Sequence, residues 1–295
     1  MSPDSALIIC RTLQDASSVL LWGAYGYLAT LVPASLAGKV ALRMVPIRLG
    51  AIGVATFATL AALPLEAASF GDGWGAALDL ATLQNILSDT NMGGVWLLQA
   101  IAAAGLVLAI GVGSRHQFAA TSLCGGLLLA CRAMFGHAIM GEGGMGILLQ
   151  ANYAVHILSA GAWLGALLPL AFIIWTLAGQ GREHGTAIVA LKHFSAAGQI
   201  MVVLAVASGV ANTGLILGRL PVTWSQPYQV LLAGKICLVG AMILLAVVNQ
   251  LLIVPRIRAG KAGAARLLAC TATAELALGA GALVLVNLFG SFDPG

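Results

Sequence analysis

The sequence is short of charge. Of its 295 residues only 8% are Asp, Glu, Lys or Arg, whereas 60% are hydrophobic. A soluble domain carries about 25% charged residues, because it needs a polar coat against water. This composition therefore excludes an ordinary soluble fold. Lipid has to cover most of the surface, which predicts an integral membrane protein.

Features of several functional classes are also missing. The formal net charge is only +4, and no basic stripe with interleaved aromatic residues occurs, which argues against a nucleic-acid partner. No phosphate-binding loop and no P-type ATPase phosphorylation motif is present, so we expect no ATP hydrolysis by this chain and do not expect an enzyme. The five cysteines include no CxxC pair, which excludes a zinc pattern or a disulfide framework. We expect most of them to act as small apolar residues.

Apolar runs dominate what is present. A bilayer core about 30 Å thick needs about 20 apolar residues per helix. The first run follows Arg11, but it is long enough to span the bilayer and most of the nearby positive charge comes after it. A cleavable signal peptide carries its positive charge in front, so this run predicts a membrane helix. The chain 1–295 is therefore predicted to be a single, all-α integral membrane domain of eight transmembrane helices. The predicted spans are roughly 16–37, 47–67, 93–112, 118–138, 149–177, 193–217, 228–253 and 266–290.

Charge is distributed unevenly between the two sets of connections. Positively charged short loops stay in the cytoplasm. With an even number of spans, the distribution predicts that the N-terminus and the C-terminus are both periplasmic. Acidic residues such as Asp15, Glu66 and Glu142 fall on the periplasmic side. The residues of the basic side are Lys39, Arg43, Arg48, Arg115, Arg182, Lys192, Arg256, Arg258, Lys261 and Arg266.

Polar side chains within the apolar runs are the informative ones, because a charged group at mid-bilayer costs about 2.5–3.5 kcal/mol. We expect few of them in the first three helices and most in the last five. The densest cluster is a glycine-rich segment that carries His137, Met140, Glu142 and Met145. Imidazole and thioether groups suit Cu(I), and a carboxylate helps to hold Cu(II). The alternative is that the methionines are apolar plugs and the histidine an interfacial cap.

The predicted fifth helix continues this pattern. Asn152, His156, Ser159 and Trp163 recur at i, i+4, i+7 and i+11, so they lie on one helical face. His137 can approach His156 if the fourth and fifth helices pack antiparallel. Two imidazoles near one vestibule predict an ion site. The alternative is a lone membrane histidine that is hydrogen-bonded to a backbone carbonyl.

Later helices add candidates for metal ligands or for a metal pathway. Lys235 can snorkel toward the interface or pair with Glu275, and such groups can also hold helices together. Arg132 would repel a nearby cation unless Glu142 or a loop aspartate neutralises it. The candidates on these helices are Asn212, Lys235, Met242 and Glu275.

As an ordered set, these pieces resemble the copper-resistance D (CopD) family, most strongly over residues 136–256. Upstream, Thr90 with Gly93-Gly94 and Trp96 resembles the entry to the family's third helix, and Glu275 with the run to Asp293-Pro294 resembles its ending. The matching pieces within 136–256 are Gly136-His137-Ala138, His156 with the run 162–170, Phe194-Ser195, Ser208-Gly209-Val210 with Asn212, Leu231-Leu232 with Lys235, and Asn249 with Val254-Pro255-Arg256.

The resemblance implies an eight-helix, multi-pass protein of the bacterial inner (plasma) membrane that moves copper, often with a small periplasmic copper-binding partner of the CopC type. His137 and His156 fall on histidine positions of the family. Two positions depart from it: Trp22 stands where relatives often have a histidine, and Tyr153 where some have a second one. The ligand role of Met140 rests on local chemistry alone, as does that of the second loop methionine.

These observations predict a copper permease. A copper ion, preferably Cu(I) but with Cu(II) still open, would be captured outside by His137 with Met140 or Met145 and passed inward along His156. One alternative is a membrane b-type cytochrome with the two histidines as axial haem ligands. A second alternative is a sensor or assembly factor that binds copper without conducting it.

Overall fold

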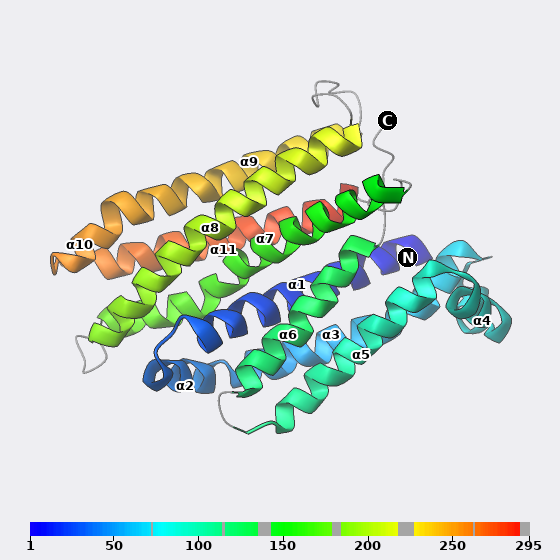
Figure 1. Ribbon diagram of the computed structural model, residues 1–295, viewed down its shortest axis with the longest axis horizontal. Coiled ribbons are helices and arrows are strands. Elements are labelled where there is room, and N and C mark those ends of the chain that lie inside the picture. Colours follow the sequence, from blue (N-terminus) through cyan, green and yellow to red (C-terminus); the bar gives the residue numbers. More distant parts are fainter. Residues whose placement is uncertain are drawn as a thin grey trace.

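The computed structural model describes residues 1–71, 73–113, 116–134, 143–178, 184–217, 227–261 and 263–289. Within these ranges the chain is built from helices and short connections and contains no strand, which confirms the predicted all-α class (Figure 1). The long helices lie roughly side by side along the longest axis of the molecule. Their ends therefore form two polar regions separated by a broad apolar one.

Seven of the described helices are long and apolar enough to cross a membrane. They match the second to eighth predicted spans, and most extend beyond the predicted bounds because polar residues at their ends are helical too. The last turn of α9 widens into a π-helical segment, η4 (Asn249–Ile253), that leads into α10 (Val254–Arg258). The seven helices are α3 (Val45–Phe70), α5 (Asn91–Gly111), α6 (His116–Cys131), α7 (Gly143–Ala178), α8 (His184–Leu217), α9 (Pro227–Val248) and α11 (Ala264–Phe289).

The first helix differs from the prediction. The expected span was 16–37, but α1 runs over Pro3–Thr30 and a separate short helix, α2 (Ala34–Arg43), follows Pro33. The boundary was placed wrongly because the first half of α1 carries polar residues, which apolar counting treats as a flank. The same residues keep α1 out of the seven apolar helices. Nevertheless α1 is central, since it packs against α3, α6 and α7 (Figure 1).

The predicted long connection, about 68–92, folds into short helices and not into a separate domain. It contains the 3-10 helix η1 (Gly73–Leu78) and α4 (Leu80–Asp89). Asp79 caps α4, and its Oδ2 accepts hydrogen bonds from the Thr82 hydroxyl at 2.6 Å and the Thr82 backbone N–H at 2.9 Å. These bonds lower the pKa of Asp79, which lies outside the membrane-spanning helices. The cap fixes the start of α4, which lies at the same end of the molecule as the N-terminus (Figure 1).

Helix directions sort the charges between the two ends. One end, which we call the α10 end, holds α2, the start of α8, α10 and the start of α11 (Figure 1). The opposite end, the α4 end, holds the starts of α1, α7 and α9 and the last turns of α8 and α11. The described basic-side residues of α2, α8, α10 and α11, among them Lys39, Lys192, Arg256 and Arg266, therefore share the α10 end.

Glycines bring α1 and α7 into close contact. A Cβ on Gly165 would lie 2.2 Å from the Val19 carbonyl oxygen, and one on Gly23 would lie 2.4 Å from the Gly161 carbonyl oxygen. Gly161 and Gly165 are four residues apart, so both face the same helix. Small residues at this spacing allow membrane helices to approach closely and gain van der Waals contact. The crossing thereby fixes the position of α7 against the central helix.

Gly165→Ala is expected to lower the free energy of unfolding by about 1–3 kcal/mol, since the methyl group would meet backbone that cannot move aside. Unfolding of the detergent-solubilised protein, followed by circular dichroism, measures the change. Gly53→Ala is the matched control, because Gly53 also lies within a membrane helix and nothing is within 4 Å of a Cβ there. Equal stability of the two variants would contradict the tight crossing.

Candidate functional site

The predicted glycine-rich cluster falls largely in a segment that the structure does not describe. His137, Met140 and Glu142 lie outside the described residues, so their ligand roles stay predictions. Met145 lies in the first turns of α7 with 53% of its surface exposed. Among the described residues no group of three or more His, Cys, Asp or Glu is placed to hold a metal ion.

His156 lies on α7 in a half-buried position against α8. Its Nδ1 is 2.8 Å from the Ala205 carbonyl oxygen. A carbonyl only accepts hydrogen bonds, so Nδ1 carries the proton and Nε2 keeps its lone pair. The predicted alternative, a histidine bonded to a backbone carbonyl, is therefore present. It is also the arrangement that metal-binding histidines use, in which the bond at one ring nitrogen orients the other as a ligand.

The surface of α8 is shaped to receive this ring. A Cβ on Gly209 would lie 3.0 Å from His156 Cε1, so a larger residue there would press on the imidazole. The Ser208 hydroxyl lies 3.4 Å from Nδ1 while it donates to the Leu204 carbonyl. The Tyr153 ring stacks beside the imidazole, with centroids 6.5 Å apart. Backbone bonding and packing together hold His156 in one orientation.

Asn152 and Asn212 join the same helices one turn nearer the α4 end. Asn152 Nδ2 donates to Asn212 Oδ1 at 2.7 Å and to the Ser208 carbonyl at 3.0 Å. The expectation that Asn152 and His156 share one helical face is confirmed, since both contact α8. We call Asn152, His156, Ser208 and Asn212 the His156 cluster. In this arrangement the amides tie α7 to α8, and His156 presents the ring nitrogen suited to an ion.

A cavity of about 320 Å³ occupies the half of the bundle nearer the α10 end. Its walls come from α7, α8, α9 and α11, and α8 and α9 scarcely touch each other over their described lengths. Trp163, which is two turns along α7 from His156 on the predicted polar face, is buried and lines the cavity. The other polar lining residues are Ser195, Gln199, Asn249, Gln250 and Glu275.

Glu275 contributes the cavity's carboxylate. Its side chain is only 2% exposed, and its Oε1 accepts a hydrogen bond from Asn249 Nδ2 at 2.6 Å. The Thr271 hydroxyl donates to Asn249 Oδ1 at 2.6 Å, which fixes the orientation of the amide. Asn249 begins the π-helical segment, a local widening that often occurs at functional sites. Sequence spacing singled out Glu275 but could not reveal the cavity beside it.

Two further candidates lie on α9. Met242 is buried, with 3% of its surface exposed, so it packs within the bundle. Lys235 lies in the third turn of α9, toward the α4 end (Figure 1). Asn249, which donates a hydrogen bond to Glu275, comes 14 residues after Lys235. At 1.5 Å per residue this places Glu275 roughly 21 Å from Lys235 along the helix. The predicted pairing of Lys235 with Glu275 is therefore wrong, because the two side chains lie at different depths in the bundle.

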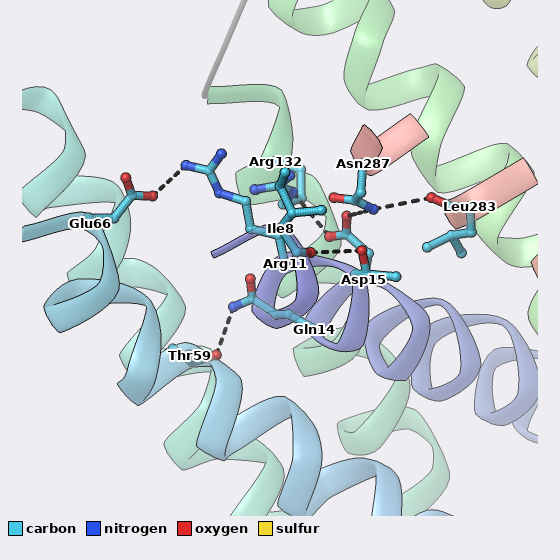
Figure 2. A network of polar contacts seen from close by, with 10 residues as sticks. Ile8, Arg11, Gln14, Asp15, Thr59, Glu66, Arg132, Leu283 and Asn287 are labelled. Atoms are coloured by element: carbon cyan, nitrogen blue, oxygen red, sulfur yellow. Dashed lines mark hydrogen bonds and ion pairs between the residues drawn. The ribbon is translucent and has the colours of Figure 1, made fainter. Parts of the chain in front are cut away.

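Sequence reasoning missed a polar network at the α4 end. We expected few polar groups in the first three helices, and this expectation is wrong. Arg132 Nε lies 3.0 Å from Asp15 Oδ1, an ion pair without hydrogen-bond alignment, and Asn287 Nδ2 donates to Asp15 Oδ2 at 3.0 Å (Figure 2). Asp15 therefore neutralises Arg132 from within α1, not from a loop. It links α1, α11 and the short 3-10 helix η2 (Arg132–Met134) that follows α6.

A second part of this network joins α1 to α3. Arg11 Nη2 lies 2.5 Å from Glu66 Oε1, and Gln14 Nε2 donates to Thr59 Oγ1 at 2.9 Å (Figure 2). The spacing of Arg11, Gln14 and Asp15 in one helix was the available signal. It was overlooked because these residues were read as the flank of a later span. Their partners are all protein groups, so the network holds the first helices together.

The sequence matches two family models. Residues 1–147 match the N-terminal domain of copper resistance protein D-like proteins, and residues 188–289 match copper resistance protein D. The inner membrane protein YebZ of Escherichia coli K12 is 30% identical over 287 residues, which are 97% of this chain and 98% of YebZ. The chain belongs to the copper resistance protein D family. The predicted resemblance is thus confirmed.

Two more relatives extend the comparison. Copper resistance protein D of Pseudomonas syringae pv. tomato is 30% identical over 219 residues, or 71% of each chain. The copper transport protein CutJ of Bacillus subtilis is 27% identical over 254 residues, which cover 82% of this chain and 44% of CutJ. No solved structure matches the sequence. With seven apolar helices and these relatives, the chain is a multi-pass protein of the bacterial inner membrane.

In this chain, α7 lies mostly between the parts that match the two family models. It packs against α1 of the first part and against α8 and α11 of the second. His156 therefore sits on the helix that joins the two parts. Trp22, a predicted departure from the family pattern, donates its indole N–H to the Leu158 carbonyl at 2.9 Å. An indole is a donor only, so Trp22 ties α1 to α7 and adds no metal ligand.

Proposed function

We propose that this protein transports copper ions across the inner membrane, from the periplasm to the cytoplasm. His156 is the central ligand, and His137, Met140, Met145 and Glu142 of the preceding segment complete the capture site. Copper is the substrate, favoured as Cu(I), which imidazole and thioether ligands suit. Family membership supports a role in copper handling. Transport and its direction are our inference.

The observation that carries the proposal is the state of the His156 ring. The bond from Nδ1 to the Ala205 carbonyl fixes the tautomer with the lone pair on Nε2. The imidazole of His156 is a neutral ligand that does not cancel the charge of copper, so at this position the ion is held weakly enough to leave again. Half-burial between α7 and α8 shields the ring from lipid while leaving part of it accessible. This combination fits a site of passage.

The orientation follows from charge and helix number. We infer that α1 is the eighth span, since 28 residues make a helix about 42 Å long and its charges are paired within the bundle. Eight spans with the basic α10 end in the cytoplasm put both termini, and the His156 cluster, on the periplasmic half. A periplasmic copper carrier of the CopC type would deliver the ion there.

The route inward runs along α7. From His156 the polar face leads past Ser159 to Trp163, which lines the inner cavity. No ATP-hydrolysing motif occurs in the chain, so the membrane potential supplies the driving force, about 2.3 kcal/mol per 100 mV for a monovalent cation. Under this proposal, the protein is a permease and not an enzyme.

Copper uptake by proteoliposomes tests the function. Vesicles with the wild-type protein and an inside-negative potential should accumulate Cu(I), and the variant His137→Ala/His156→Ala should lose at least about 90% of that uptake, or tenfold. Uptake no greater than in protein-free vesicles would refute transport. Copper bound to the purified protein without uptake would instead favour a sensor or assembly factor, and a haem absorption band would favour a cytochrome.

A further inference from the structure

Glu275 raises a question that a copper route alone does not answer. Among the described residues that line the inner cavity, it is the only one with an ionisable side chain. The rest of the lining is apolar or carries amide and hydroxyl groups. A carboxylate in such surroundings is costly when it is charged and unpaired, because lipid-embedded protein offers it little solvation. Its presence in a cavity therefore indicates a partner that comes and goes.

The groups packed around Glu275 offer little compensation. From η4, Asn249 donates one hydrogen bond to it. From α7 and α8, the facing residues are Trp163, Ser195 and Gln199, none of them ionisable at ordinary pH. The charged residues on the packed elements lie elsewhere. Arg256, Arg258 and Arg266 are exposed at the α10 end, as are Lys192 and His193 of α8. Lys235 lies in the third turn of α9, toward the α4 end, and Asp15 of α1 is bound to Asn287 at that end.

The chemistry of the cavity does not suit lasting copper binding. Carboxylate and amide oxygens are hard ligands, whereas Cu(I) prefers sulfur and imidazole. A carboxylate can still balance the charge of a passing monovalent cation. When the cation leaves, a proton is the one small cation that is available in every compartment and forms a covalent bond to oxygen. The cavity has room for the ion, and lies in the half nearer the cytoplasm.

We propose that Glu275 is a proton-exchange site that keeps the inner cavity electrically neutral, releasing a proton to the cytoplasm when a copper ion enters and taking one back when the ion leaves. In the first step the O–H bond of the carboxylic acid breaks, and the carboxylate remains beside Cu⁺. In the second step the ion leaves and a cytoplasmic proton re-forms the O–H bond. No electron is transferred, and the net movement is one copper ion. This inference rests on the proposed transport function.

The proposal predicts competition between protons and copper for the cavity. In wild-type proteoliposomes with the same pH inside and outside, initial Cu(I) uptake should fall as the pH is lowered. In Glu275→Gln the uptake rate should depend less steeply on pH. The loss of one competing proton lowers the slope by up to about tenfold in rate per pH unit. The amide of glutamine can still accept the bond from Asn249, so the variant should keep its fold. Glu275→Asp should keep the wild-type slope, because it retains a carboxyl group.

Two controls make the result specific. Asp89→Asn removes an exposed carboxylate at the end of α4 and should leave the slope unchanged. Infrared difference spectra of the copper-free protein should contain a protonated carboxyl band that Glu275→Gln removes. An unaltered slope in Glu275→Gln, a pH-independent wild type, or the absence of that band would overturn the proton-exchange site. Wild-type vesicles that take up no copper would refute the transport function, while the infrared band still tests Glu275 by itself.

Discussion

His156→Ala is expected to lower the affinity of the purified protein for Cu(I) by about 100-fold or more. Removing a group that hydrogen-bonds to a metal ligand typically lowers metal affinity by about 10–100-fold, and this change removes the ligand itself. The Ala205 carbonyl that orients the ring belongs to α8, so the substitution leaves the backbone of both helices in place. Competition against a Cu(I) chelator of known affinity measures the change.

The chain provides a matched control for this experiment. His193 Nδ1 also donates to a backbone carbonyl, that of Leu31, at 2.8 Å. It is exposed and lies on α8 about 12 residues before Ala205, toward the α10 end, or roughly 18 Å away along the helix. His193→Ala should therefore keep the wild-type affinity. If the two variants bound copper equally well, His156 would not be the central ligand.

Asp15→Ala is expected to lower the free energy of unfolding by about 3–5 kcal/mol, the usual cost of leaving one partner of a buried ion pair alone. The side chains of Asp15 and Arg132 are only 11% and 19% exposed, so water would solvate the remaining guanidinium poorly. Asn287 would lose its acceptor as well. Chemical unfolding in detergent, followed by circular dichroism, measures the loss.

A second substitution separates the ion pair from general damage. Asp15→Leu/Arg132→Met replaces both charges with apolar groups and should be more stable than Asp15→Ala, because no charge is left without a partner. Asp4→Ala on the same helix is the control. Asp4 accepts a hydrogen bond from Ser69 in an exposed position, and its loss should cost no more than about 0.5 kcal/mol. A double variant less stable than the single one would contradict the assigned role.

The network around Asp15 shows where reading by apolar runs fails. Counting apolar residues finds helices that face lipid, because the lipid requires a continuous apolar surface. A central helix such as α1 is covered by other helices, so it can carry Arg11 and Asp15 if their partners lie on α3 and in the turn directly after α6. Those partners are 55 and 117 residues away in sequence, and nothing in the local pattern indicates them.

The His156 cluster was easier to anticipate. Regular spacing placed Asn152 and His156 on one face of a helix, and the structure confirms this. What spacing could not supply was the acceptor for the ring, since a backbone carbonyl carries no residue signature. The cavity beside Glu275 was equally hidden, because it depends on how far α8 and α9 stand apart.

By itself, the sequence determined that this is a membrane protein, that it is helical, which family it resembles and that its positive charge is unevenly placed. Each of these follows from composition or local pattern, because lipid demands long apolar helices and excludes charge. Only the tertiary structure decided that α1 is the central helix, which nitrogen of His156 keeps its lone pair, and that a carboxylate borders a cavity. Those properties arise from contacts between distant segments, and their geometry is set by packing and not by any one stretch of the chain.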